Sequence, residues 1–515
     1  MINKRFLLFF LFVFCLLFCS ACETNKPKAE RHVRDKDVIV LAAWRHQAPG
    51  NKDGYYCSSL LKVWEPLITH DETGRPAPKL AESWEMLEDG KKWVFHLKKG
   101  VYFHNGTKFN ADSVIKNFDR MRKGIKRSSF YSLDIDTFYP ALVKYEKLDE
   151  YTIQLIFAHP SINQLYKMMN LGSPVYAPEC FAIDGNFNGP AIGTGPYKIR
   201  ENSLDKYVEL QRNETYYGTK AKTKRILIYK IPHFDMRYSA LKAEEIDGVL
   251  DLNAIPPFLA EEIEKDDRFA VFAKKSSMTR FLAVNGNKFP FNDLRLRKAL
   301  SLSINRKNIV EALYLNYANP TTNILNYTSP YYKEFPVRFD IDEAKKLVRS
   351  VVGNKRIEAL YCINGADPLQ KGEAELIAYW LKNIGIDVTI QSLEYATLVK
   401  QIRKGNYDIA RLQQGLPNGD PYSIFYSFMM PDGGRNVSCN AGYFNEEVIR
   451  LLNEAKYTTD EAKRKEIYYR IQEIAVDEQP VIPLFNDMNI VAYNKRLKNY
   501  GFAKTGIDLA KIEVR

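Results

Sequence analysis

Histidine is a favoured ligand of transition metals, and the chain has seven histidines. They stand at His32, His46, His70, His96, His104, His159 and His233. No two of them are three or four residues apart, so no single helix or strand offers a bidentate pair. The spacing of the histidines therefore does not predict a metal site. His46 differs from the rest because it lies in a loop, residues 44–50, that directly follows a predicted strand.

Short motifs of nucleophilic and metal-dependent hydrolases are missing from the chain. It has no G-x-S-x-G, no H-E-x-x-H, and no S-x-x-K accompanied by its partner motifs. Gly193-Thr-Gly-Pro-Tyr-Lys198 lacks the spacing of a phosphate-binding loop, and a turn before a strand explains it better. The sequence predicts a protein that is not an enzyme and needs no cofactor. A secreted hydrolase, whose ligand would be converted rather than recovered unchanged, is the disfavoured alternative.

A cysteine follows an apolar run at the N-terminus. Lys4 and Arg5 precede an uninterrupted apolar stretch of 13 residues, Phe6–Phe18, which suits a signal peptide and is short for a membrane-spanning helix. Ser20-Ala21-Cys22 then resembles the lipobox of bacterial lipoproteins, although Cys19 stands where leucine is usual. The alternative, a redox or metal pair formed by Cys19 and Cys22, would require a neighbouring βαβ pattern. We expect a signal peptide at residues 1–21 and lipidation of Cys22, which would anchor the chain to a membrane outside the cytoplasm.

The composition of the remaining chain predicts a globular protein of two or three domains. Residues 22–36 are polar and aperiodic, which is typical of a flexible tether. The net charge is +12, or +10 without Lys4 and Arg5, and the positive residues are spread along the chain. This distribution predicts a basic surface and no nucleic-acid partner. The widely spaced Cys57, Cys180, Cys362 and Cys439 imply no small disulfide framework.

Short strand-like runs alternate with amphipathic helical stretches, a pattern that predicts a mixed α/β fold. The first strand is expected at 38–43. A second strand is expected at 92–97, after the turn residues Asp89-Gly90, and a helix should begin after Asn110 as its N-cap.

The C-terminal half repeats this alternation. A helix with an apolar stripe over 376–384 should stop at Gly385 and lead into a strand at 386–390. Asn445 should cap one helix, Thr458 with Glu461 should form the capping box of the next, and residues 481–485 should form a strand.

Several segments together resemble family 5 of the extracellular solute-binding proteins, the peptide- and nickel-binding proteins of ABC importers. They include LAESWEMLEDGKKWVFHLKKGVYFHNGTKFNADSVI at 80–115, IGTGPYKIR at 192–200, NETYYG at 213–218, FNDLRLRKALSLSINRKNIVEAL at 291–313, IGIDVTIQSLEYATLVKQIRKGNYDIA at 384–410 and the two-helix segment 445–480. They occur in the order found in the family and cover nearly all of the chain after residue 36.

The resemblance implies an α/β protein with a two-lobed, periplasmic-binding-protein-like fold of type II, in the large family 5 variety, with a ligand cleft between the lobes. One lobe would hold residues 37–280 and 484–515 and include an extra subdomain specific to the family. The other would hold residues 281–483. The lobes would close on the ligand by a hinge motion. The expected partners are the permease and ATPase subunits of the importer, and the expected state is a monomer.

The resemblance leaves two ligand classes open. In dipeptide-binding members a carboxylate near the loop 413–422 binds the α-amino group of the peptide, and Asp420 matches the Asp of their Asn-Gly-Asp-Pro sequence. A peptide zwitterion in a closed cleft also needs a cation, because an unpaired buried charge is costly. Arg280 and Arg411 are the candidates for this cation, and Tyr56 and Tyr422 are the expected aromatic contacts, with Tyr55 beside them.

The second ligand class is nickel or a nickel chelate. Residues 192–237 look most like the nickel-binding branch, in which a histidine of the later loop helps to bind the metal. Here Tyr422 stands in place of that histidine, so a chelator would have to supply most of the metal ligands. His46 is the remaining candidate for ligand contact. A ligand-sensing receptor built on the same fold is the alternative of another class.

Overall fold

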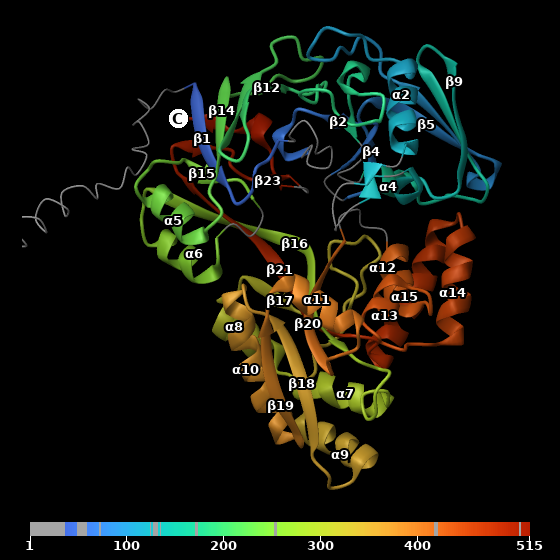
Figure 1. Ribbon diagram of the computed structural model, residues 1–515, viewed down its shortest axis with the longest axis vertical. Coiled ribbons are helices and arrows are strands. Elements are labelled where there is room, and N and C mark those ends of the chain that lie inside the picture. The colour runs from blue at the N-terminus through green and yellow to red at the C-terminus, as the bar shows by residue number, and fades with distance from the viewer. Residues whose placement is uncertain are drawn as a thin grey trace, which may run out of the picture.

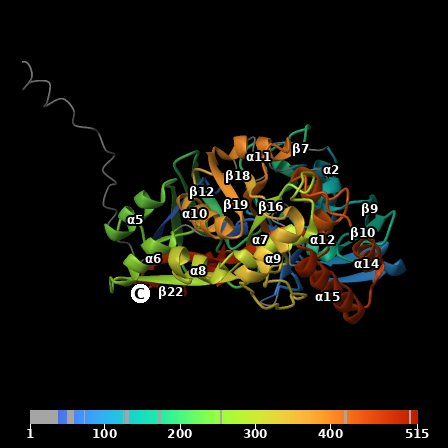
Figure 2. The ribbon, with the colours of Figure 1, turned by 90° about the horizontal axis from the view of Figure 1, so that it is seen from below.

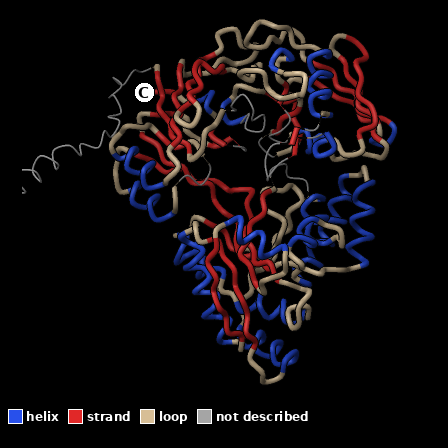
Figure 3. The backbone as a smooth tube through the Cα atoms, viewed as in Figure 1, coloured by secondary structure: helices blue, strands red, loops and turns tan. Residues whose placement is uncertain are grey.

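Two groups of helices and strands lie one above the other in Figure 1, and the long strands β16 (Phe269–Val284) and β21 (Ile482–Asn494) run between them. The computed structural model describes residues 37–48, 59–71, 74–123, 125–126, 132–133, 135–169, 174–251, 255–416, 421–503 and 506–515. Over these residues the expectation of a two-lobed α/β fold is confirmed. Figure 3 shows strands continuing from the upper group into the lower one.

One sheet of 11 strands passes through both groups, in the order β12-β13-β14-β1-β15-β21-β16-β20-β18-β19, with β17 paired to β21. Near one end, β1 (Val38–Ala43) is parallel to β14 and β15, and near the other end β18 (Ile357–Asn364) is parallel to β19 and β20. The central pair β16 and β21 is antiparallel. The other members are β12 (Tyr197–Ser203), β13 (Tyr207–Arg212), β14 (Arg225–Lys230), β15 (Gly248–Val249), β17 (Ala318–Pro320), β19 (Ile386–Leu393) and β20 (Ile409–Gly415).

The hydrophobic cores fall into the same two groups as the helices and strands. One core takes its buried residues from positions 39–269 and 490–512, and we call the surrounding structure the larger lobe. Two adjoining cores take theirs from positions 281–485, and they define the smaller lobe. The strand β16 contributes Phe269 to the first core and Phe281 and Leu282 to the others, so the chain changes lobe within this strand. The boundaries at 280/281 and 483/484 remain a prediction.

The larger lobe carries a separate antiparallel sheet in the order β5-β6-β10-β9. Its strands are β5 (Ala81–Leu87), β6 (Lys92–Leu97), β9 (Leu142–Asp149) and β10 (Thr152–Phe157). The helix α2 (Ala111–Arg122) packs against it through Phe118, whose ring stacks on Tyr145 at 5.1 Å between centroids. Shorter pairs join β2 (Glu65–Pro66) to β11 (Pro174–Val175), β3 (Ile68–His70) to β4 (Pro76–Pro78), β7 (Ile125–Lys126) to β8 (Ser132–Leu133), β22 (Leu497–Lys498) to β25 (Glu513–Val514) and β23 (Phe502–Ala503) to β24 (Gly506–Ile507).

Helices cover the sheets in both lobes. Those of the larger lobe include α3 (Ile135–Phe138), α4 (Gln164–Met168), α5 (Phe234–Lys242) and α6 (Pro257–Glu264). Those of the smaller lobe include α7 (Leu294–Ser303), α8 (Arg306–Tyr314), α9 (Ile341–Val352), α10 (Pro368–Asn383), α11 (Tyr395–Arg403), α12 (Tyr422–Met429), α13 (Gly434–Ser438), α14 (Glu446–Tyr457) and α15 (Glu461–Glu478). Figure 2 shows α5 and α6 at one end of the molecule and α14 and α15 at the other. Among the described residues, no helix is both long and apolar enough to cross a membrane.

Most of the locally predicted boundaries are confirmed. The predicted strand at 92–97 is β6, and Asn110 caps α2 by accepting a 3.1 Å hydrogen bond from the backbone N–H of Ser113. One prediction is wrong: the cap of α15 is Asp460, which accepts from the backbone N–H groups of Ala462 and Lys463. The Thr458 hydroxyl instead donates back to the Glu454 carbonyl at 2.8 Å. Because Glu454 lies in the last turn of α14, the Thr458 hydroxyl bonds to the end of that helix. Asp460 is then the residue that caps α15.

Candidate functional site

A pocket lies where the two lobes meet, beside the carboxyl ends of parallel strands. In the larger lobe, β14 and β15 lead into α5 and α6, and in the smaller lobe β18 leads into α10. The carboxyl ends of strands are where open α/β sheets bind ligands. The cavity measures about 190 Å³, and we call it the interlobe pocket. Its lining residues are Phe234, Arg237, Ile255, Pro256, Pro257, Arg280, Tyr314, Tyr317, Asp367, Pro368, Leu369, Asp487, Met488 and Ile490.

An ion pair between the two connecting strands supplies the pocket with one cation and one anion. The Arg280 side chain on β16 donates from Nε to both carboxylate oxygens of Asp487 on β21, at 2.9 and 2.8 Å, and its Nη2 lies 2.6 Å from Oδ2. The side chains are only 16% and 6% exposed. Burial alone would lower the pKa of Arg280, but Asp487 outweighs burial and holds that pKa above its ordinary value. Arg280 is therefore charged, and both Arg280 and Asp487 line the pocket.

A second ion pair lies deeper in the smaller lobe. Arg411 on β20 donates from Nε to Glu373 Oε2 at 2.7 Å and from Nη2 to Oε1 at 3.1 Å. The Tyr314 hydroxyl donates to the same carboxylate, and the Tyr314 ring packs on Phe485 at 4.5 Å between centroids. Although burial opposes it, Glu373 holds the pKa of Arg411 above its ordinary value. Arg411 and Glu373 are almost entirely buried, so the pair supports the wall of the pocket on which Tyr314 lies.

In the larger lobe, the charge of Arg237 acts on a buried carboxylate with a shifted pKa. Asp251 follows β15 and accepts hydrogen bonds from the backbone N–H of Trp44 and, at 2.9 Å, from Gln47 Nε2. Burial raises the pKa of Asp251 to about 6, although the hydrogen bond from Trp44 and the charges of Arg45 and Arg237 act in the opposite direction. Arg237 lines the pocket and donates to the carbonyls of Ile231 and Pro232 at 2.7 and 2.8 Å.

We expect Asp251→Asn to change how stability depends on pH. The pKa of an unfolded aspartate is about 3.9, so between pH 4 and 6 the native wild type binds more protons than its unfolded state and loses stability as the pH rises. The asparagine variant lacks this dependence. From pH 4 to pH 7 the stability of the wild type relative to the variant should fall by about 2 kcal/mol. Calorimetry of both proteins over this range measures the difference, and parallel pH curves would contradict the raised pKa of Asp251.

Several contacts join the two lobes. The hydroxyl of Tyr317, which lines the interlobe pocket, donates to Glu264 Oε1 on α6 at 3.2 Å. Arg464 on α15 donates from Nη2 to Asn163 Oδ1 at 2.6 Å, and Arg75 Nη2 lies 3.3 Å from Glu461 Oε1. Each contact joins a residue of the larger lobe to a residue of the smaller lobe, so a hinge motion that separates the lobes would have to break it.

Only Arg280 among the predicted site residues lines the interlobe pocket in the described part of the chain. Arg411 lies behind its wall, and His46 binds Asn202 through Nε2 at 2.6 Å on the larger lobe. Tyr422 begins α12, where its ring lies 5.8 Å from that of Tyr426. Four predicted residues fall outside the described residues: Cys22, Tyr55, Tyr56 and Asp420.

Sequence reasoning missed several residues that line the pocket. Asp367 caps α10 by accepting a 3.1 Å hydrogen bond from the backbone N–H of Leu369, and an aspartate directly before a proline could have indicated this position. No comparable sequence pattern indicated Asp487 or Arg237. In the described ranges, no cluster of three or more His, Cys, Asp or Glu is arranged to hold a metal. Cys180, Cys362 and Cys439 are buried free thiols.

Comparison with known proteins gives a consistent result. The family described as "Bacterial extracellular solute-binding proteins, family 5 Middle" matches residues 75–436. The chain is 27% identical to the nickel-binding periplasmic protein of Escherichia coli, with 93% of this chain and 94% of that protein covered. It is also 27% identical to the di/tripeptide-binding protein 1 of Pseudomonas aeruginosa, with 86% of each covered. A third relative, heme-binding protein A of Haemophilus influenzae, is 27% identical, with 84% of this chain and 82% of that protein covered.

Solved structures share the fold. The chain resembles NikA from Brucella suis in complex with Fe(III)-EDTA, with a TM-score of 0.81 and 23% identity, covering 93% of this chain and all of that one. It also resembles the periplasmic binding protein DppA from Helicobacter pylori in complex with the peptide STSA, with a TM-score of 0.74 and 23% identity, covering 93% of this chain and 98% of that one. At this identity the likeness concerns the fold.

Proposed function

Because this chain belongs to the bacterial extracellular solute-binding proteins of family 5, we propose that it captures a small peptide outside the cytoplasm and delivers it to the permease and ATPase of an ABC importer. Proteins of this family bind substrates and do not convert them. The pocket between the lobes supports a binding role, because hinge closure of two lobes encloses a ligand without chemistry.

The observation that carries the peptide assignment is the Arg280–Asp487 pair within the interlobe pocket. A peptide brings an ammonium and a carboxylate, and each needs a fixed partner of opposite sign once water is excluded. Arg280 is the proposed partner of the peptide carboxylate, and Asp420 is the proposed partner of its amine. Arg411 acts on the fold rather than on the ligand in this proposal, because its side chain is only 1% exposed and is not among the lining residues of the interlobe pocket.

The curated relatives differ in the ligands that their names give, which include di/tripeptides and nickel. A nickel chelate is therefore the second candidate ligand of this chain, with His46 as its proposed contact, and a ligand-sensing receptor is the alternative use of the same fold. We also propose that Cys22 carries the lipid anchor, that the mature protein is a monomer, and that the lobes divide at 280/281 and 483/484.

Native mass spectrometry of the mature protein, purified from its own host and followed by ligand release, tests the proposal. A set of intact peptide masses is expected. A nickel isotope pattern accompanied by an organic chelator would replace the peptide assignment with the second candidate. An empty protein that shows no thermal shift with peptide or chelate libraries would contradict both ligand assignments.

We expect Asp420→Asn to weaken peptide binding at least tenfold, because the buried ammonium of the ligand would lose a charge-assisted hydrogen bond worth about 1.5–3 kcal/mol. Titration calorimetry with a dipeptide measures the effect. Asp432→Asn is the matched control, since Asp432 is an exposed carboxylate that accepts from Tyr426 at 2.6 Å and is not among the lining residues of the interlobe pocket. Equal affinities of the two variants would exclude Asp420 as the amine partner.

A further inference from the structure

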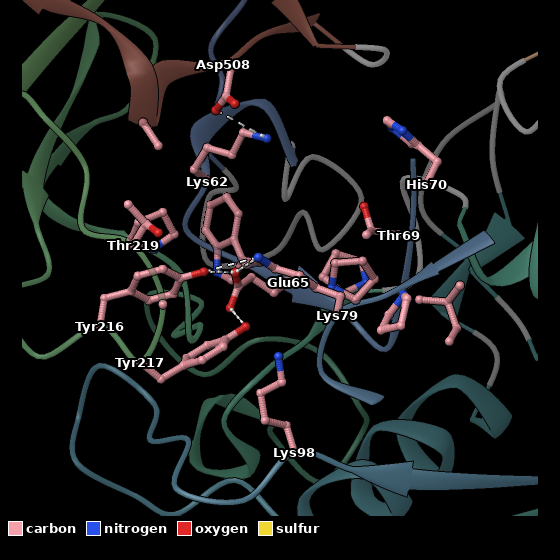
Figure 4. A pocket seen from close by; sticks show the side chains of 18 of the residues that line it. Lys62, Glu65, Thr69, His70, Lys79, Lys98, Tyr216, Tyr217, Thr219 and Asp508 are labelled. Carbon is pink, nitrogen blue, oxygen red and sulfur yellow. Dashed lines mark hydrogen bonds and ion pairs between the residues drawn. The ribbon is translucent and has the colours of Figure 1, made fainter. Parts of the chain in front are cut away.

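A larger cavity lies entirely within the larger lobe. It measures about 530 Å³, which falls within the usual range of small-molecule sites. Its lining comes from residues 62–219 and from the C-terminal residues Asp508 and Ala510, and it shares no lining residue with the interlobe pocket. Figure 4 shows this cavity, which we call the lysine cavity after the side chains of Lys62, Lys79 and Lys98.

A buried carboxylate forms the centre of the lysine cavity and uses all of its acceptor positions. Glu65 Oε1 accepts from the Tyr216 hydroxyl at 2.7 Å and lies 2.8 Å from Lys79 Nζ. Its Oε2 accepts from the hydroxyls of Tyr217 at 3.0 Å and Thr194 at 2.9 Å. A carboxylate offers about four lone-pair sites, so Glu65 has none left for a ligand. Its role is to fix the two tyrosines and Lys79, as the dashed lines in Figure 4 show.

The cations of the cavity outnumber the anions that can neutralise them. Although burial opposes it, Glu65 and Tyr216 hold the pKa of Lys79 above its ordinary value, so Lys79 stays charged and balances Glu65. Lys62 Nζ lies 3.7 Å from Asp508, which is an ion pair without a close hydrogen bond. Lys98 Nζ lies 5.3 Å from the centre of the Tyr217 ring, and among the described residues no carboxylate forms an ion pair with it. Lys98 therefore supplies an uncompensated positive charge.

Part of the cavity lining is apolar and closely packed. Four prolines line the cavity together with the two tyrosine rings, whose centroids are 4.7 Å apart. Gly195 is packed so closely that an added Cβ would lie 2.2 Å from the Lys62 carbonyl oxygen, so the segment that leads from Lys62 into β2 is held against it. At Gly218 an added Cβ would lie 2.8 Å from the Tyr216 ring. A cavity fixed by such close contacts needs little reorganisation to bind a ligand.

We propose that the lysine cavity is a second ligand site that binds a small organic anion, a carboxylate or phosphate joined to an apolar body the size of one ring. The anionic group contacts the ammonium of Lys98, with Lys62 as a second donor. The apolar body lies against the tyrosine and proline walls. Such a site has one strong charge contact and an apolar surface, which is the usual composition of a small-molecule site.

Titration calorimetry with benzoate and phenyl phosphate tests this second site, and benzyl alcohol serves as the neutral analogue. One molar equivalent of at least one anion should bind to the mature wild-type protein, and benzyl alcohol should bind at least tenfold more weakly. The two anions distinguish a carboxylate from a phosphate ligand.

The matched variants are Lys98→Met and Lys99→Met. Lys99 is the next residue along the chain, is exposed, and lies over the Tyr151 ring outside the cavity. Lys98→Met should weaken binding of the anion at least tenfold, whereas Lys99→Met and Asp420→Asn should leave it unchanged. Absence of anion binding to the wild type, or equal affinities of the Lys98 and Lys99 variants, would overturn the proposal. Thermal unfolding of Lys98→Met confirms that the variant is folded.

Discussion

Glu373→Met is expected to lower the free energy of unfolding by about 3–5 kcal/mol, because it leaves the guanidinium of Arg411 buried and unpaired. Arg411 is 1% exposed and Glu373 is fully buried, so water cannot replace the lost carboxylate without opening the core of the smaller lobe. The Tyr314 hydroxyl would lose its acceptor as well. Chemical denaturation followed by intrinsic fluorescence measures the change.

Two control variants separate the loss of charge compensation from the loss of the side chain itself. The double variant Glu373→Met with Arg411→Met removes both charges and should recover most of the stability, since buried ion pairs replaced by apolar residues of similar volume are often neutral or better. Glu447→Gln breaks the exposed pair with Arg470, whose side chains are 39% and 50% exposed, and should change the free energy of unfolding far less than Glu373→Met does. If Glu373→Met costs no more than Glu447→Gln, the buried pair does not support the lobe.

The parts of the fold that the sequence predicted are those whose cause is local. The strand at 92–97 follows from alternation of side chains, and the Asn110 cap follows from one side chain reaching a backbone group three residues away. The wrong capping box at Thr458 shows the limit of this reasoning. Two polar residues, Thr458 and Asp460, could each cap α15, and the carbonyl of Glu454 at the end of the previous helix decided between them.

The candidate site depends on pairs that no local pattern contains. Arg280 and Arg411 could be selected from the sequence as possible cations near the lobe crossing. Their partners could not be selected, because Asp487 lies 207 residues from Arg280 and Glu373 lies 38 residues from Arg411. These partners also give the two arginines different environments: one lines the interlobe pocket and the other lies behind it. The three-dimensional pairing therefore decides which arginine a ligand can reach.

Arg280→Met is expected to weaken binding of the peptide ligand about 30-fold or more, since truncating one partner of a buried charge pair in a binding site costs about 2–5 kcal/mol. Arg280 lines the interlobe pocket and lies at hydrogen-bonding distance from the carboxylate of Asp487. Without it, Asp487 would repel the carboxylate of the ligand and remain buried without a counter-charge. Titration calorimetry with the peptide recovered from the native protein measures the loss.

The variant Arg280→Met with Asp487→Met distinguishes a binding role from a purely structural one. Removing both charges should restore thermal stability, because no unpaired charge remains between β16 and β21. It should not restore the affinity, because the cation for the ligand is still missing. Arg295→Met, which breaks an exposed pair with Asp293 at 2.7 Å, should leave affinity unchanged. If the double variant binds the peptide as tightly as the wild type, the Arg280–Asp487 pair only joins the two connecting strands, and the ligand carboxylate must be held by another group.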